Sequence, residues 1–349
     1  MIPVFDGHND FLQRMVAAGP DRDRLWLTGD GTGNLDLPRM RQGGFAGGFF
    51  AIWTPMAEND IPGGYKAAMA APPYAVPLPR EVPLAEALPQ GFEQAAQLMA
   101  MERAGGLRIC RSAGDIRAAM QAGQIAAIMH MEGAEPIRDI DALHVWHAMG
   151  LRSLGPVWSR STVWGHGVPF AFPASPDTGD GLTAMGKDLV RACNRLRIML
   201  DLSHLNEKGF DDIARLSDAP LVASHSNAHA LCPSSRNLTD RQLDIIRDSG
   251  GLVGLNFAVN FLVADGSRHP FSGFGPMLRQ LDYLLEKLGP DGVALGSDYD
   301  GATMPADLAS VANLQALIAA MQAHGYDQAL LRKIAHENWV SLLERTWGA

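Results

Sequence analysis

The chain has 349 residues, of which 47% are apolar and 19% charged, and its formal net charge at pH 7 is −9. This composition is typical of a globular protein and excludes a disordered chain, and the negative charge argues against a nucleic-acid partner. No run reaches the ~18 apolar residues that span a bilayer, and the first residues lack the pattern of a secretion signal. We therefore expect a cytoplasmic protein with no membrane partner. Three isolated cysteines without C-x-x-C spacing are expected to be buried small hydrophobes: Cys110, Cys193 and Cys232.

Short apolar runs with the character of buried strands alternate with amphipathic helical segments along the chain. This alternation predicts a parallel sheet, and eight such units favour an α/β fold closed into a (β/α)8 TIM barrel, as a single domain over residues 1–349. An open doubly wound sheet is the alternative. The strand-like runs are 2–6, 45–53, 125–130, 151–157, 198–203, 220–225, 251–257 and 292–297. Helical patterns cover, for example, 92–104, 185–197 and 276–288.

Residues 54–90 interrupt the alternation and form a proline-rich insertion after the second strand. Because proline lacks an amide hydrogen and fixes φ, we expect no regular structure there. In a barrel this insertion follows a strand on the side where active sites form, so it is either a surface excursion or a lid or subunit contact. Its prolines are Pro55, Pro62, Pro72, Pro73, Pro77, Pro79, Pro83 and Pro89.

Histidine and carboxylate side chains follow several of the predicted strands at the point where each strand ends. His8 and Asp10 come directly after the first run, and their i, i+2 spacing places both on one side of the strand. In a (β/α)8 barrel the carboxyl ends of all strands meet at one face, where functional side chains gather. The others in chain order are Glu132, His204, His225 and Asp298.

Three histidines, two aspartates and one glutamate fit a hydrolytic site with two metal ions and a water between them. Two cations can ionise such a water near neutral pH, so that it attacks a carbonyl. Glu132 is the natural bridge between the ions, because it follows a middle strand and no other carboxylate at a mid-barrel strand end competes with it. Asp298 remains as the proton shuttle to the leaving amine.

Each of these residues also has a structural alternative. A histidine at a strand end is often a satisfied structural residue, and Asp10 and Asp298 are equally suited to helix caps or turns. The joint occurrence of six such residues at one end of one barrel favours the metal site. Among the other histidines, His130 either supports the site or packs in the core, while His166 and His229 are candidates for substrate contact.

With these residues placed, the chain resembles the membrane (renal) dipeptidase family, the M19 metallopeptidases of the amidohydrolase superfamily. The resemblance covers most of the chain, because five separate segments occur in the family's order. These segments are Asp6-Gly7-His8-Asn9-Asp10, Glu132-Gly133, Asp201-Leu202-Ser203-His204, Ser224-His225-Ser226 and Gly296-Ser297-Asp298-Tyr299-Asp300-Gly301.

The resemblance implies two Zn²⁺ ions, although other divalent metals are compatible with the ligands. It implies His8, Asp10 and Glu132 as ligands of one ion. It further implies that Glu132, with the two later histidines His204 and His225, holds the second ion. Asp298 matches the family's acid/base aspartate. Arg236, in Ser234-Ser235-Arg236-Asn237, matches an arginine that binds the substrate carboxylate, a role that suits its bidentate fork.

The chain departs from the family pattern after the fourth strand. The family commonly has Leu-Thr-His there, and that histidine polarises the scissile carbonyl, whereas Trp158 stands near this position here. An indole N–H donates a hydrogen bond but cannot become cationic. Arg160 and His166 are candidate substitutes at the substrate.

We therefore expect a binuclear zinc hydrolase that cleaves the amide bond of dipeptides, and the resemblance suggests a homodimer. One alternative keeps the metal site but acts on another small amide or a lactone, which the Trp158 departure keeps open. A second alternative is a barrel that binds a small ligand without turnover, against which the complete set of ionisable residues argues.

Overall fold

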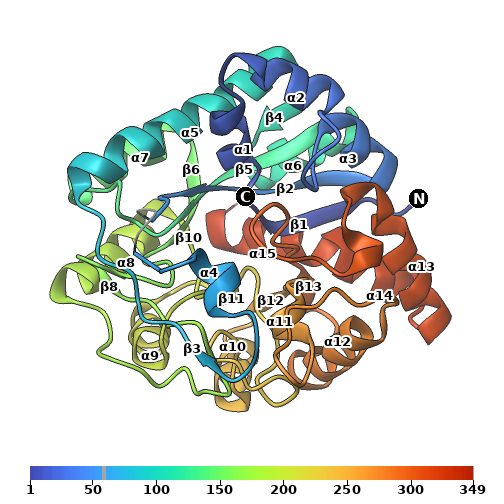
Figure 1. Cartoon of the computed structure of the whole chain (residues 1–349). Coiled ribbons are helices and arrows are strands. Elements are labelled where there is room, and N and C mark those ends of the chain that lie inside the picture. Colours follow the sequence, from blue (N-terminus) through green and yellow to red (C-terminus); the bar gives the residue numbers. More distant parts are fainter. Residues whose placement is uncertain (57–59, 349) are drawn as a thin grey trace.

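The computed structural model describes residues 1–56 and 60–348. Eight parallel strands form its centre, and helices surround them (Figure 1). The barrel strands are β1 (Val4–Asn9), β2 (Phe45–Trp53), β5 (Ile125–Glu132), β6 (Leu151–Gly155), β10 (Met199–Leu200), β11 (Val222–Ala223), β12 (Leu252–Leu255) and β13 (Val293–Leu295).

The order of these strands in the sheet is β10-β6-β5-β2-β1-β13-β12-β11. A parallel bridge between Asp201, just after β10, and Val222 of β11 joins the two ends of this path. The sheet is therefore a nearly closed parallel barrel rather than an open doubly wound sheet. Each of the eight predicted runs overlaps one of its strands, and β1 and β5 extend beyond the runs predicted at 2–6 and 125–130, which confirms the predicted α/β barrel.

Shorter strands lie outside the eight-strand path and were not predicted. β4 (Leu107–Ile109) pairs with the first half of β5, and its two buried residues flank an exposed Arg108. Three residues are too few for an alternation to be recognised in the sequence. The remaining strands form two small antiparallel pairs, β3 (Tyr74–Ala75) with β9 (Ala171–Phe172) and β7 (Ser161–Thr162) with β8 (Gly165–His166).

Helices cover the outside of the barrel and follow the predicted patterns closely. The helix predicted at 185–197 is observed one residue earlier, and the one at 276–288 begins one residue earlier. The helices are α1 (Phe11–Ala18), α2 (Arg22–Thr28), α3 (Leu37–Gly43), α4 (Gly64–Ala68), α5 (Leu84–Ala104), α6 (Ala113–Gln121), α7 (Ile140–Met149), α8 (Ala184–Leu196), α9 (Glu207–Leu216), α10 (Asp240–Asp248), α11 (Val259–Leu262), α12 (Gly275–Leu288), α13 (Leu314–His324), α14 (Gln328–Arg332) and α15 (Asn338–Trp347).

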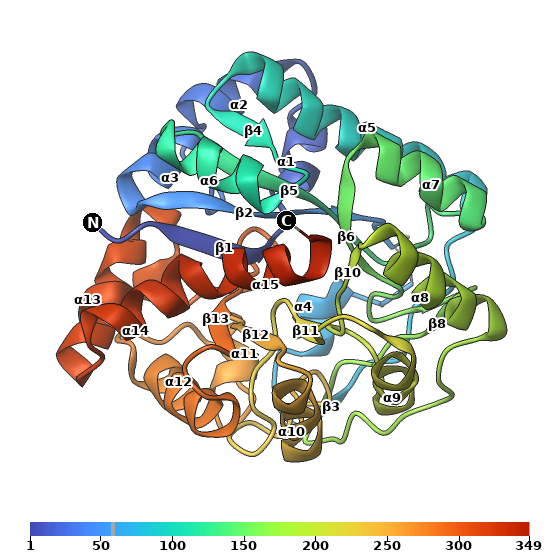
Figure 2. The same cartoon turned by 180° about the vertical axis from the view of Figure 1, so that it is seen from behind.

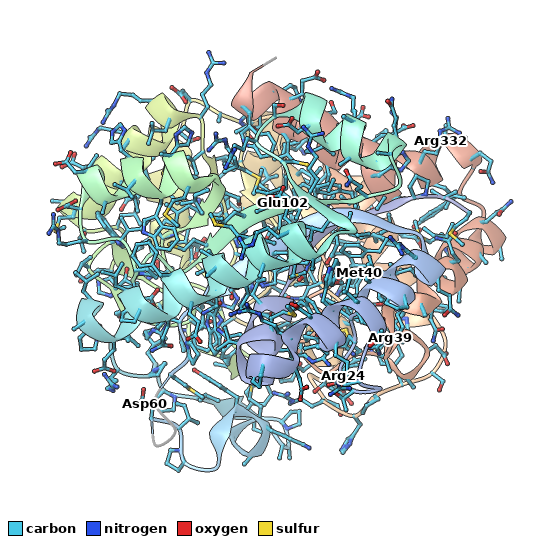
Figure 3. The ribbon with its side chains drawn as sticks, turned by 90° about the horizontal axis from the view of Figure 1, so that it is seen from above. Arg24, Arg39, Met40, Asp60, Glu102 and Arg332 are labelled. Carbon is cyan, nitrogen blue, oxygen red and sulfur yellow. The ribbon has the colours of Figure 1, made fainter. Side chains whose placement is uncertain are left out.

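The proline-rich segment 54–90 contains regular structure, so the prediction that it has none is wrong. Its prolines lie between short elements more than inside them: α4 and β3 fall in proline-free stretches, and Pro83 is the residue that precedes α5. Only Pro89 lies within α5. Residues 57–59 of this segment lie outside the described residues. In Figure 3, Asp60 on this segment projects at the opposite end of the molecule from Arg332.

An indole from the C-terminal helix fills the end of the barrel away from the strands' carboxyl ends. Figure 2 shows α15 lying across this end of the barrel. Trp339 of α15 is fully buried, packs against Phe49 at a ring distance of 5.0 Å, and donates from Nε1 to the carbonyl of Leu295. A Cβ on Gly7 of β1 would lie 2.6 Å from the Trp339 ring. Glycine is therefore required there by close approach, and the barrel interior is closed by a tryptophan.

Two further expectations from composition can be compared with the structure. Cys110, Cys193 and Cys232 are free and buried, as predicted. None of the helices within the described residues combines the length and apolar character needed to cross a bilayer.

Candidate metal centre and its cavity

The structure brings together the ionisable residues that follow the predicted strands. His8 lies in β1, Glu132 ends β5, and the other residues occupy the loops that follow the strand ends. They form three overlapping groups whose ligand atoms lie within 4.8 Å of one another. These groups are His8 with Asp10 and Glu132; Glu132 with His204 and His225; and His8 with His225 and Asp298.

Glu132 lies at the centre of this cluster. Its Oε1 atom is 3.1 Å from His204 Nε2 and 3.3 Å from His225 Nε2. The same oxygen is 3.6 Å from His8 Nε2, which in turn is 3.5 Å from Asp10 Oδ2. One carboxylate oxygen thus faces three imidazole nitrogens, as a bridging ligand between two ions would.

Buried polar atoms in the cluster fit divalent cations. His8 is fully buried, and among the described residues neither of its ring nitrogens has a hydrogen-bond partner, nor does Glu132 Oε1. Buried polar atoms without partners are rare in proteins, and a metal ion accounts for them here. Asp10 precedes α1 but forms no side-chain cap hydrogen bond, so its carboxylate remains available as a ligand.

Two serines orient the later histidines. Ser159 Oγ lies 2.8 Å from His204 Nδ1, and Ser224 Oγ lies 2.8 Å from His225 Nδ1. Partners at Nδ1 leave each Nε2 to face Glu132, which is the arrangement that orients metal-ligating imidazoles.

The cluster perturbs the pKa values of its members strongly. Burial raises the pKa of Glu132 to about 8 and that of Asp298 to about 6. Burial acts to lower the pKa of His8, but the nearby carboxylates, Glu132 first, outweigh it and raise this pKa to about 10. Burial lowers the pKa values of His204 and His225 well below the usual range. Burial thus disfavours the ionised form of the Glu132 and Asp298 carboxyls and the protonated form of His204 and His225, whereas the neighbouring carboxylates favour protonated His8; bound cations would replace these protons as the positive charges of the site.

Two of the cluster residues have unusual backbone conformations. His204 has φ of +69° and Asp298 has φ of +62°, both in the left-handed region that non-glycine residues rarely adopt. Such conformations cost on the order of 1–3 kcal/mol each and occur mainly where function requires a particular side-chain direction. The structural alternative of Asp298 as a turn residue is therefore compatible with its place in the cluster.

A buried carboxylate behind the cluster fixes the loops that carry the histidines. Asp201 Oδ1 accepts from the backbone amides of Ser203 and Ser224, at 3.0 and 2.8 Å. The Ser224 hydroxyl donates to Asp201 Oδ2. His130 Nε2 lies 3.6 Å from the same oxygen, and its Nδ1 lies 2.8 Å from Ser153 Oγ. His130 thus contacts groups behind the metal-ligating residues.

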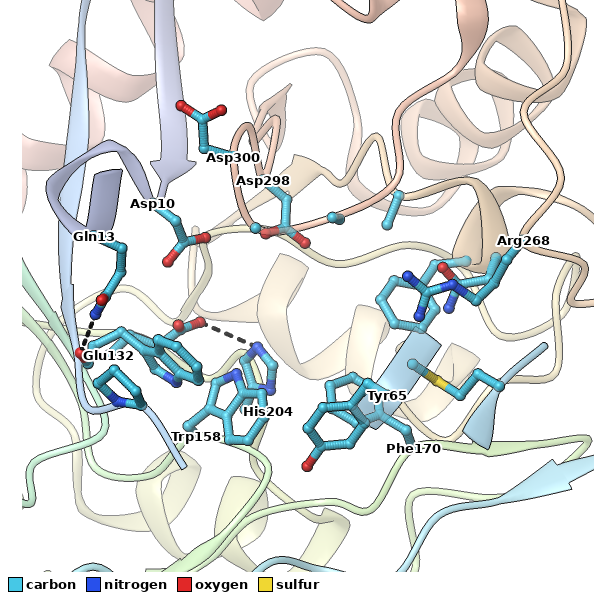
Figure 4. A pocket seen from close by; sticks show the side chains of 18 residues that line it. Asp10, Gln13, Tyr65, Glu132, Trp158, Phe170, His204, Arg268, Asp298 and Asp300 are labelled. Atoms are coloured by element: carbon cyan, nitrogen blue, oxygen red, sulfur yellow. Dashed lines mark hydrogen bonds and ion pairs between the residues drawn. The ribbon is translucent and has the colours of Figure 1, made fainter. Parts of the chain in front are cut away.

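A cavity of about 380 Å³ opens in front of the cluster (Figure 4). This volume is within the range of small-molecule sites. The lining includes Glu132, His204, Asp10 and Asp298 at one end, together with apolar and aromatic side chains. The other residues lining it are Gln13, Trp53, Pro55, Tyr65, Met69, Trp158, Phe170, Ala258, Asn260, Phe261, Arg268, Asp300, Gly301 and Ala302.

The residues predicted to contact substrate take different positions. Trp158 lines the cavity, and its ring lies 5.7 Å from that of His204. Arg236 is buried next to the cluster: Nη1 donates to Ser226 Oγ and Nη2 to the carbonyl of His225. Burial lowers the pKa of Arg236 to about 10, so it remains a cation at neutral pH.

Arg160 and His166 are not among the residues that line the cavity. Two guanidinium nitrogens of Arg160 donate to Glu135 Oε1, at 2.8 and 2.7 Å, in a buried ion pair. His166 Nδ1 lies 2.9 Å from Ser161 Oγ within the β7–β8 pair. Their contacts favour structural roles for both residues.

Several residues of the cluster's surroundings and of the cavity were not found from the sequence. Asn256 donates to Asp298 Oδ2 at 3.0 Å and follows the end of β12, where a barrel places functional side chains. Its position near the end of a predicted strand could have indicated Asn256 as a functional residue. Tyr65 and Met69 come from the proline-rich segment, so part of this segment covers the cavity.

Comparisons with known proteins agree with this site. The model of the membrane dipeptidase family, peptidase family M19, matches residues 1–347. The crystal structure of dipeptidase AC, a metallo peptidase of family M19, is 60% identical in sequence and superposes with a TM-score of 0.97. The match covers 100% of this chain and 99% of that chain. A metallo peptidase from Rhodobacter sphaeroides, liganded with a phosphinate mimic of the dipeptide L-Ala-D-Ala, is also 60% identical, with a TM-score of 0.97 and 99% coverage of both chains.

A relative from Klebsiella pneumoniae, an uncharacterized protein in the pqqA 5' region, is 50% identical over 224 residues, which are 63% of this chain and 82% of that protein. Because the family model spans almost the whole chain, the alternative of a non-catalytic ligand-binding barrel is set aside. The chain belongs to the membrane dipeptidase family, peptidase family M19, and is an enzyme of that family.

Proposed function

We propose that this protein is a zinc-dependent dipeptidase with two metal ions bridged by Glu132. The observation that carries the proposal is the position of Glu132 Oε1, which three buried histidine Nε2 atoms face at 3.1 to 3.6 Å. His8, Asp10 and Glu132 would hold one ion, and Glu132, His204 and His225 the other. Two such cations would polarise the scissile carbonyl and lower the pKa of a water between them.

Asp298 is the group proposed to transfer the proton. Its Oδ2 accepts from Asn256, and a carboxylate oxygen of Asp298 lies within 4.8 Å of ligand atoms of His8 and His225. A carboxyl whose pKa lies near 6 can accept a proton at neutral pH and return it to the leaving amine. The left-handed backbone at this residue supports a role that depends on side-chain direction.

Arg236 is proposed to bind the C-terminal carboxylate of the dipeptide. Its Nε atom has no hydrogen-bond partner among the described residues, and its guanidinium lies beside the metal-ligating His225. A buried guanidinium with spare donors is suited to a carboxylate. Trp158 is proposed as the wall against which the substrate packs, because it lines the cavity next to His204.

One observation keeps a second substrate class open. Trp158 stands where the family commonly has a histidine that polarises the scissile carbonyl, and an indole offers at most one neutral donor. Activated carbonyls, such as those of lactones, need less polarisation than peptides. The same metal centre would then act on a lactone or another small amide.

Metal analysis together with a substrate panel tests the proposal. We expect elemental mass spectrometry of the loaded protein to give two equivalents of metal per chain and Glu132→Gln to reduce both. We also expect L-Ala-D-Ala to be hydrolysed, because the 60%-identical structure holds a mimic of it. One equivalent of metal would contradict the bridge, and lactone turnover without dipeptide turnover would favour the second class. The suggested homodimer and cytoplasmic location stay predictions.

A further inference from the structure

A half-buried arginine on the cavity wall forms no ion pair with any carboxylate in the described part of the chain. Arg268 lies in the loop between α11 and α12 and lines the cavity, as do Asn260 and Phe261. Figure 4 shows its side chain reaching into the cavity from the side away from Gln13 and Glu132. One guanidinium nitrogen, Nη2, donates to Thr303 Oγ1 at 3.1 Å. Within residues 1–56 and 60–348, no carboxylate forms an ion pair with Arg268.

The loop that carries Arg268 is anchored on both sides of it. Gly266 has φ of +67°, and a Cβ there would lie 2.5 Å from the Phe172 ring, so the loop packs tightly against β9. Beyond Arg268, the carbonyl of Phe271 accepts from the amide of Ala306 at 2.9 Å. Anchors on either side present the guanidinium to the cavity in a fixed direction, which lowers the entropy lost when it binds a ligand.

The charges of the cavity are divided between its two ends. Of the four carboxylates that line the cavity, those of Asp10, Glu132 and Asp298 lie at the end formed by the cluster, where bound cations would neutralise them, and that of Asp300 forms an ion pair with Arg14 at 3.2 Å. At the other end Arg268 is a permanent cation. A partly buried guanidinium without a counter-ion is unfavourable, and a ligand anion would relieve this cost.

The α-carboxylate of a dipeptide does not account for Arg268 when Arg236 binds that group. Arg236 lies directly behind His225, whereas Arg268 reaches the cavity from another loop and hydrogen-bonds Thr303. The protein therefore has cationic groups at two separate places: Arg236 is buried beside the cluster and is not among the residues lining the cavity, whereas Arg268 lies on the cavity wall.

We propose that Arg268 binds a second carboxylate of the substrate, so that this enzyme prefers dipeptides with an acidic side chain. The proposal rests on the proposed dipeptidase function: the amide bond lies at the metal centre and the α-carboxylate at Arg236. Arginine suits this role because its planar fork can donate two parallel hydrogen bonds to a carboxylate. Asn260, 3% exposed, adds an amide group to the cavity lining.

Pairs of substrates that differ by one charge test the proposal. The metal-loaded enzyme is assayed on Ala-Glu against Ala-Gln and on Glu-Ala against Gln-Ala, with L and D forms of each C-terminal residue. We expect kcat/KM for the acidic member of at least one pair to exceed that of its amide by about 10-fold or more, as for a charge-assisted bidentate contact. Arg268→Met is expected to abolish this ratio, and Arg268→Lys to keep part of it.

Arg332→Met serves as the matched control, because Arg332 is exposed and pairs with Glu337 far from the cavity. It should leave every ratio unchanged. Two results would overturn this inference and leave the proposed function intact. One is turnover of neutral dipeptides with no preference for an acidic side chain at either position. The other is a preference for acidic side chains that survives in Arg268→Met. Absence of turnover on every dipeptide would overturn both.

Discussion

The two halves of the barrel hold the same metal cluster by different means. In one half, β1, β2 and β5 contain six, nine and eight residues; β2 pairs with β5 in one continuous register and with β1 in a register that shifts twice. In the other half, β10 and β11 contain two residues each and β13 contains three. There, buried carboxylates bind backbone amides instead: Asp201 accepts from Ser203 and Ser224, and Asp6 accepts from Ser297 at 2.6 Å.

This difference shows that the side chains of one site are oriented in two ways. Glu132 ends the long, regularly paired strand β5, whereas His8 lies where the register of β1 with β2 shifts, so an irregularity in the pairing helps to set the direction of its side chain. The short strands release the chain early, so His204 and Asp298 adopt left-handed conformations that a strand cannot accommodate. The long strands hold their residues by backbone pairing. In the short-strand half, hydrogen bonds from backbone amides to the carboxylates of Asp201 and Asp6 hold side-chain directions that a regular strand does not offer.

The largest expected effect comes from Asp298, on the short-strand side. Asp298→Asn keeps the size of the side chain but cannot accept the proton, so we expect kcat to fall by about 10²-fold or more with both metals retained. Steady-state kinetics and elemental analysis measure these two quantities. Asp291→Asn, at an exposed aspartate paired with Lys333, is the control and should not change kcat. A near wild-type rate for Asp298→Asn would place the proton transfer elsewhere.

Arg236 tests whether the short-strand half also binds the substrate carboxylate. Arg236→Met should reduce kcat/KM for dipeptides by roughly 2–4 kcal/mol, because a buried charge-assisted pair is lost. Dipeptide amides, which lack the carboxylate, should be poor substrates of the wild type and change little in the variant. Equal wild-type rates on a dipeptide and its C-terminal amide would instead favour the lactone or small-amide class.

Asp201 tests the hydrogen bonds by which its carboxylate holds the backbone amides of Ser203 and Ser224. In Asp201→Asn an amide nitrogen must face the backbone amides or the Ser224 hydroxyl, so we expect the free energy of unfolding to fall by about 2 kcal/mol. Hydrogen exchange measured by mass spectrometry should become faster in β10 and β11 and stay unchanged in β2 and β5. Uniform acceleration in both halves would show that the halves are not held independently.

Metal removal is expected to give the smallest change in the fold. Chelation should accelerate hydrogen exchange in residues 201–205 and 224–226, because the loops that carry His204 and His225 lose their ligand. Residues 45–53 provide the internal comparison, since β2 pairs with β5 from Gly47 to Trp53 and with β1 at positions between Phe45 and Phe50. Equal acceleration in the two regions would contradict the difference in how the halves are held.

The sequence predicted the barrel and the residues of the cluster because both depend on local patterns. His8 and Asp10 follow their strand in the sequence, and the barrel's topology alone brings them to Glu132 and His225. Arg268 could not be predicted as a cavity residue, because its position depends on how a loop of twelve residues packs against Phe172 and Ala306. The role of Asp201 was equally hidden, since a carboxylate that binds backbone amides leaves no periodic pattern. Pro89 within α5 shows the reverse case, where tertiary packing overrides a local preference.

The position of β1 between β2 and β13 sets the order in which the enzyme can form during synthesis. Val4–Asn9 is synthesised before the other barrel strands, yet one of its neighbours, β13, begins at Val293, and the ring that fills the barrel beside Gly7 belongs to Trp339. A nascent chain therefore carries His8 long before Asp298 or the tryptophan that closes the barrel exists. Pairing over this separation is slow to form, which favours late, concerted closure. The newly made protein should gain its metal-binding and hydrolytic capacity together, only after Trp339 has been translated.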